Sequence, residues 1–76
     1  MNLHNPLDPA LPVWQAVDGS PIGCTEKIKV LNENFQELRQ LAQDALEDGV
    51  LMGCAENLLR EAMHELIDSL QLDYSN

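Results

Sequence analysis

The 76-residue sequence is poor in basic side chains, with four Lys and Arg against 13 Asp and Glu. The resulting formal charge of −9 disfavours binding to nucleic acid, because phosphate backbones repel an acidic surface. Anionic membrane surfaces are disfavoured for the same reason. We therefore expect neither a nucleic acid nor a membrane among the partners of this chain.

Cysteine and long hydrophobic runs are also scarce. Cys24 and Cys54 are too few and too far apart for the disulfide framework of a small secreted domain. The longest uninterrupted apolar run, at residues 50–52, is far too short to span a bilayer, and residues 1–5 carry none of the basic side chains of a signal peptide. These absences predict a cytoplasmic protein.

The chain is short for a stable domain. At this length a folded chain buries only about 60% of the surface that its unfolded form exposes, so stability usually requires a staple or a partner. Hydrophobic residues make up 45% of the sequence, which is too much for a wholly disordered chain. We expect one small folded domain that associates with a partner.

Residues 1–23 contain all four prolines and no basic residue. This composition predicts an irregular Pro-rich leader, and its apolar content indicates that part of it packs on the rest of the chain. Pro12 suits the first turn of a short helix through Trp14 and Ala16, which would end at a turn at Asp18 and Gly19.

From Cys24 onward, apolar residues recur with alternating steps of four and three, the heptad pattern of an amphipathic helix. The first helix is predicted at about 25–52, with Thr25 as its N-cap. We prefer Gly53 as the glycine that follows it, because an end at Asp48 would leave a needlessly apolar loop. A second amphipathic helix is predicted at about 54–72, and the short connection requires an antiparallel hairpin.

The sequence therefore predicts an all-α fold in which the leader precedes a helical hairpin domain, 24–76. Two helices cannot bury apolar stripes that are wider than a coiled-coil seam, so we expect two hairpins to pair as a homodimeric four-helix bundle. The predicted core and interface residues are Ile28, Leu31, Phe35, Leu38, Leu41, Ala42, Ala45, Leu46, Leu58, Leu59, Ala62, Met63, Leu66, Ile67 and Leu70.

This architecture resembles the small two-helix hairpin proteins that dimerise into Rop-type bundles. RNA binding by a bundle of that type requires a basic face, which this chain lacks. The likeness therefore implies a fold and carries no function.

Two sets of side chains are candidates for chemistry. Cys24 and Cys54 fall at opposite ends of one hairpin, but in an antiparallel dimer Cys54 of one chain would approach Cys24 of the other and form a redox or metal site. Free cysteines are more often simply buried. Glu61 and His64 have the spacing of di-iron helical bundles, yet both fall on the polar side of their helix. We expect no metal and no cofactor.

The acidic residues are concentrated around the predicted turn. No Lys or Arg occurs between Gln40 and Leu59, a stretch that contains Asp44, Glu47, Asp48 and Glu56. Such a cluster either keeps the protein soluble or steers a basic protein partner to this end of the hairpin. Trp14 is a further candidate for partner binding, or packs on its own hairpin.

No nucleophilic triad, phosphate-binding glycine loop or zinc ribbon is present, so an enzyme is not expected. The sequence predicts a small acidic interaction or adaptor protein. Two alternatives stay open. One is a metal-binding or redox protein that uses Cys24 and Cys54 across a dimer interface, and the other is an acidic mimic of nucleic acid that binds a basic protein.

Overall fold

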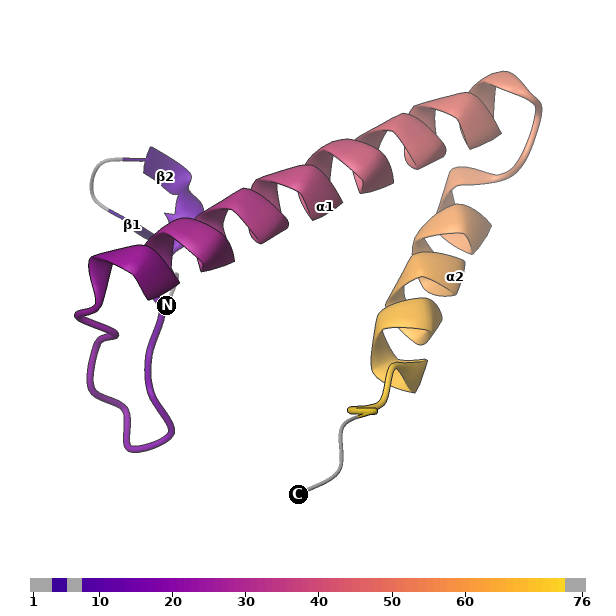
Figure 1. Ribbon diagram of the computed structural model, residues 1–76. Helices are drawn as coiled ribbons and strands as arrows, with labels where there is room; N and C mark the ends of the chain where they lie inside the picture. Colours follow the sequence, from indigo (N-terminus) through magenta and orange to yellow (C-terminus); the bar gives the residue numbers. More distant parts are fainter. Residues whose placement is uncertain (1–3, 6–7, 74–76) are drawn as a thin grey trace. The chain divides into compact units, whose positions relative to one another are not determined.

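The structure is a computed structural model that describes residues 4–5 and 8–73 (Figure 1). Its elements are β1 (His4–Asn5), β2 (Asp8–Pro12), α1 (Thr25–Leu51) and α2 (Glu56–Ser69). The two helices and the turn between them confirm the predicted all-α helical hairpin.

The chain divides into two compact units, Met1–Gln40 and Leu41–Asn76, whose boundary lies inside α1. We call them the N-terminal unit and the C-terminal unit. The first holds the strands and the beginning of α1, and the second holds the end of α1 and the whole of α2.

The leader is more regular than its composition predicts. β1 and β2 pair antiparallel, with His4 opposite Pro12 and Asn5 opposite Asp8. Proline cannot donate a hydrogen bond, but it is tolerated in an edge strand of this kind, and it biases the residue before it toward extended backbone. The prolines of the leader therefore favour a short ladder in place of the irregular backbone that was expected.

The short helix predicted from Pro12 is wrong. β2 ends at Pro12, and Gln15 forms an isolated antiparallel bridge with Pro21. The predicted turn at Asp18 and Gly19 is confirmed, since the Gly19 N–H donates to the Ala16 carbonyl at 2.9 Å and Gly19 has a φ of +90°. This turn closes a loop that places extended backbone where a helix was expected.

The loop brings Trp14 onto α1. The Trp14 Nε1–H donates to Asn32 Oδ1 at 2.7 Å, and the indole meets the ring of Phe35 edge-on, with centroids 5.7 Å apart. Leu11, which is only 5% exposed, lies in the small core of the N-terminal unit. These contacts pack the end of the leader on the first turns of α1.

Cys24, rather than the predicted Thr25, is the N-cap of α1. The Ile28 N–H donates to the Cys24 carbonyl at 3.0 Å, which is the first bond of the helix. The Cys24 sulfur accepts hydrogen bonds from the backbone N–H groups of Lys27 and Glu26. A thiol thus fills the place that Ser, Thr, Asp or Asn usually takes at a helix start, and Thr25 is already helical.

The end of α1 confirms Gly53 as the residue that stops the helix. The Cys54 N–H donates to the Gly49 carbonyl at 2.9 Å and the Gly53 N–H donates to the Val50 carbonyl at 3.0 Å. Gly53 has a φ of +95°, which is a left-handed conformation that glycine adopts without strain. This pair of bonds is a Schellman motif.

The predicted bounds of the second helix are too wide. Because Cys54 takes part in the turn, α2 begins at Glu56 with Ala55 as an extended N-cap. The helix ends at Ser69, whose hydroxyl donates to the Leu66 carbonyl at 2.7 Å, and Leu70 is extended. A serine that bonds to the backbone competes with helix continuation, which the apolar spacing out to Leu72 does not reveal.

The helices of the C-terminal unit meet at one point. Gly49 is the only buried residue among residues 41–73, and a Cβ at this position would lie 2.6 Å from Leu59 Cδ1. Four apolar residues around this contact are half-buried: Ala42, Leu46, Leu59 and Met63. The remaining apolar side chains among residues 41–73 are exposed.

Candidate functional site

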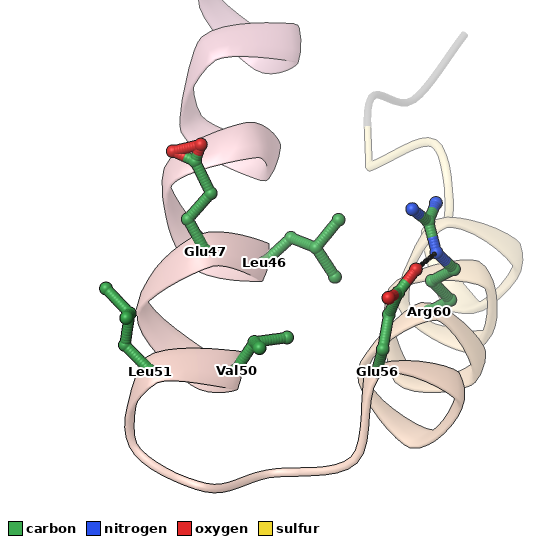
Figure 2. A pocket seen from close by; sticks show the side chains of 6 residues that line it. All are labelled: Leu46, Glu47, Val50, Leu51, Glu56 and Arg60. Carbon is green, nitrogen blue, oxygen red and sulfur yellow. Dashed lines mark hydrogen bonds and ion pairs between the residues drawn. The ribbon is translucent and has the colours of Figure 1, made fainter.

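The C-terminal unit carries an open hollow beside its turn, which we call the turn hollow. It has a volume of about 400 Å³ and is lined by Leu46, Glu47, Val50, Leu51, Glu56 and Arg60 (Figure 2). Leu46 and Val50 extend from α1 toward α2, while Glu56 and Arg60 stand together on α2. The hollow therefore combines aliphatic side chains with charged side chains.

The charged side chains of the turn hollow each interact with a neighbour on their own helix. Arg60 Nε lies 2.8 Å from Glu56 Oε2, and both side chains are more than half exposed. An exposed pair at this spacing contributes about 0.3–0.5 kcal/mol to the helix. Glu47 accepts a hydrogen bond from Gln43 Nε2 at 3.1 Å. These weak exposed contacts leave the carboxylates accessible to a ligand.

The four acidic residues of the predicted cluster lie in two different places in the structure. Glu47 and Glu56 come from different helices and line the turn hollow together. Asp44 and Asp48 are exposed on α1 outside the lining of the hollow. The cluster is thus divided between the hollow and the neighbouring surface of α1.

The charge of the whole chain is concentrated in the C-terminal unit. Residues 41–76 contain eight acidic residues and one basic residue, Arg60, for a formal charge of −7 out of the chain's −9. Arg60, the one basic residue in this stretch, is bonded to Glu56.

Trp14, the aromatic candidate for partner binding, lies in the N-terminal unit. Its ring is half-buried and its N–H is satisfied by Asn32. The geometry favours the alternative in which Trp14 packs on its own helix.

The cysteine and histidine candidates do not gather into a site among the residues that the structure describes. Cys24 and Cys54 are both free and exposed, and Glu61 and His64 are exposed on α2. Nowhere in residues 4–5 and 8–73 do three potential metal ligands from His, Cys, Asp and Glu come together.

The pKa of the Cys24 thiol bears on its reactivity. Its pKa lies below the ordinary value for cysteine, mainly because the backbone N–H of Lys27 bonds to the sulfur, with smaller contributions from Glu26 and from the charge of Lys27. Both the hydrogen bonds and the neighbouring charge favour the thiolate over the thiol.

The sequence did not predict the structural contacts of three residues: Asn32, Gly49 and Arg60. The pairing of Arg60 with Glu56 was available from their spacing of four along a helix. Gly49 occupies a position of the heptad pattern, which is a signal of close helix approach. Nothing local to Asn32 indicates that it receives the Trp14 N–H, because the two are 18 residues apart.

Comparison with known proteins identifies no relative: no protein-family model, curated protein or solved structure matches this chain. Within the described part of the chain, neither helix contains a stretch long and apolar enough to cross a membrane.

Proposed function

We propose that this protein is a non-catalytic interaction module whose C-terminal unit binds a basic protein partner. The observation that carries the proposal is the surplus of eight acidic residues over one basic residue in residues 41–76. We define the acidic surface by its seven exposed carboxylates on the two helices: Asp44, Glu47, Asp48, Glu56, Glu61, Glu65 and Asp68.

Electrostatics and apolar contact have separate roles in this proposal. The acidic surface raises the rate of encounter with a basic partner and rejects acidic ones. The turn hollow supplies an anchor point, where Leu46 and Val50 accept an apolar side chain while Glu56 on the facing helix receives the neighbouring Lys or Arg. A ligand suited to this site presents basic and aliphatic side chains close together, and we place the encounter in the cytoplasm.

The test is affinity capture with quantitative mass spectrometry, using the full chain as bait. In the variant Glu47→Lys/Asp48→Lys, the charge at the turn is reversed at two exposed positions. The matched control Glu33→Lys/Glu37→Lys makes the same change at exposed positions of the N-terminal unit. We expect a basic protein that the wild type and the control capture and the variant does not.

The captured protein is then purified, and its dissociation constant is measured over a range of NaCl concentrations. Binding should weaken as salt rises, because screening reduces attraction between opposite charges. Equal capture by variant and control, or an affinity that does not depend on salt, contradicts the proposal. Displacement of the partner by double-stranded DNA would specify that the chain acts as a mimic of nucleic acid.

A second function is supported by the exposed Cys24 thiol at the start of α1, whose pKa is lowered by backbone hydrogen bonds. In this alternative, Cys24 of one chain and Cys54 of another form a redox or metal site. Metal analysis and intact mass under mild oxidation test it, with Cys24→Ser and Cys54→Ser as variants. A metal-free wild type that forms no disulfide, with variants of unchanged stability, contradicts the alternative.

A further inference from the structure

An arginine of the chain itself lies at the charged side of the turn hollow. Arg60 Nε donates a hydrogen bond to Glu56 Oε2 at 2.8 Å, and both side chains line the hollow. The two terminal nitrogens of Arg60 point away from the carboxylate (Figure 2). The structure thus shows a guanidinium that is bound to Glu56 side-on, through its Nε.

The pair of Glu56 and Arg60 is open to exchange with a ligand. The exposed fraction of the side chain is 57% for Arg60 and 59% for Glu56. Exposed pairs four residues apart on a helix are weak, so breaking this one reduces the affinity of a ligand only about twofold. A basic side chain that arrives from solvent can therefore compete with Arg60 for the carboxylate.

An arginine of a partner gains more from this exchange than a lysine does. Its guanidinium is not attached to α2, so it can approach Glu56 end-on and donate two parallel N–H groups to the two carboxylate oxygens. A lysine ammonium brings a single nitrogen, and its contact merely replaces the contact of Arg60 Nε. The exchange therefore favours a guanidinium.

The aliphatic side of the turn hollow fits the stem of such an arginine. Leu46 and Val50 extend from α1 toward α2, and Val50 is 45% exposed. Arginine buries its methylene groups along apolar surface while its charged end stays with a polar partner. The volume of about 400 Å³ lies within the range of small-ligand sites, about 300–1,000 Å³. The hollow thus has room for one long side chain and an aliphatic neighbour.

We propose that the turn hollow binds an arginine side chain of the partner, which takes the place of Arg60 at Glu56. This inference rests on the proposed function, and it names the side chain that the hollow recognises. Arg60 acts as an internal competitor that lowers the affinity for every basic side chain. Because an arginine recovers more of that loss than a lysine, Arg60 makes the hollow selective between the two.

The first test uses two small probes of equal charge, N-acetyl-leucyl-arginine amide and N-acetyl-leucyl-lysine amide. Each is titrated into the isotopically labelled full chain, and its dissociation constant is measured from the backbone amide shifts. We expect saturable shifts at Leu46, Val50, Glu56 and Arg60, and tighter binding of the arginine probe. Equal affinities for the two probes, or no saturable binding at these residues, overturn the proposal.

The variant Arg60→Gln removes the competitor. It should bind the arginine probe about twofold to fivefold more tightly than the wild type, because Glu56 is released and a like charge is removed. The matched control is Lys29→Gln, which makes the same change of charge at an exposed position of the N-terminal unit. It should bind as the wild type does. A gain in Arg60→Gln that is no larger than in the control overturns the competition.

Two further measurements keep the proposal testable if Arg60→Gln does not fold, which circular dichroism will show. Glu56→Gln should lose the preference for the arginine probe, because a neutral amide cannot form the paired bonds to a guanidinium. In the wild type, the Arg60 Nε–H resonance should move as the arginine probe binds, since its hydrogen bond to Glu56 is broken. A resonance that stays unchanged at saturation overturns the exchange.

The captured partner separates failure of this inference from failure of the proposed function. Equal affinity of that partner for the wild type, Arg60→Gln and Glu56→Gln overturns the arginine site and leaves binding to the acidic surface intact. Absence of any captured basic protein overturns the proposed function itself.

Discussion

Gly49 of α1 lies against Leu59 of α2 so closely that a Cβ on Gly49 would come within 2.6 Å of Leu59 Cδ1 and 3.2 Å of its Cγ. No other residue of the described C-terminal unit is buried. The approach of the two helices therefore depends on the absence of a side chain at position 49.

The first prediction concerns this contact. Gly49→Val should destabilise the C-terminal unit, because overpacking costs typically about 1–3 kcal/mol and Leu59 must move away from the helix. The measurement is the thermal midpoint, which changes by about 4–8 °C per kcal/mol in a domain of this size. Gln36→Val, at an exposed position of the same helix, controls for the helix propensity of valine. Equal midpoints for the two variants would contradict the contact.

The second prediction concerns the turn after α1. Gly53→Ala should destabilise the protein by about 1–2 kcal/mol, because alanine is strained at a φ of +95°. Its Cβ meets no atom within 4 Å, so the cost arises from the backbone alone. Gly23→Ala is the matched control, since Gly23 also has open space and has no positive φ. Urea unfolding should separate the two variants, and equal unfolding free energies would show that the turn is not strained.

Gly49 and Gly53 show which parts of this fold the sequence predicts and which it does not. The heptad spacing and Gly53 predict α1 to within a residue of its end, because amphipathic periodicity and a C-terminal glycine are strong local signals. The interior Gly49 also follows the seam. Its role in helix contact depends on Leu59, which approaches it only after the chain has turned.

The missed features have local physical causes. The helix expected from Pro12 does not form because the prolines of the leader favour extended backbone, which pairs β2 with β1. The cap of α1 was assigned to Thr25 because hydroxyls are common caps, whereas the sulfur of Cys24 makes the bonds. The sequence identifies the members of the acidic cluster. It does not predict which of them line the turn hollow and which lie on the neighbouring surface of α1, because that depends on how the two helices approach each other.

The third prediction tests the packing of the leader through a double-mutant cycle. Trp14→Phe and Asn32→Ala each remove the 2.7 Å hydrogen bond and should each cost about 1 kcal/mol in unfolding free energy. Because both changes remove the same bond, the double variant should be destabilised by less than the sum of the single variants. Additive losses would mean that the indole N–H and the Asn32 side chain are not coupled.

The fourth prediction concerns Cys24 and is made in a Cys54→Ser background. Hydrogen bonds at the start of α1 lower the pKa of the thiol, so alkylation by iodoacetamide should reach half its maximal rate at a lower pH in the folded protein than in urea. A lowered folded-state pKa also means that this thiolate stabilises the fold above the unfolded pKa. That contribution is lost as the pH falls through the folded value. Identical alkylation profiles in the folded and unfolded states would show that the cap does not act on the sulfur.

The central claim is the proposal that the acidic surface of the C-terminal unit binds a basic protein partner. The most direct measurement is the dissociation constant of the captured partner for the wild type, for Glu47→Lys/Asp48→Lys and for the control Glu33→Lys/Glu37→Lys, over a range of NaCl concentrations. The account predicts weaker binding by the first variant alone, and an affinity of the wild type that falls as salt rises. Equal affinities for all three proteins, or an affinity that does not change with salt, would contradict it.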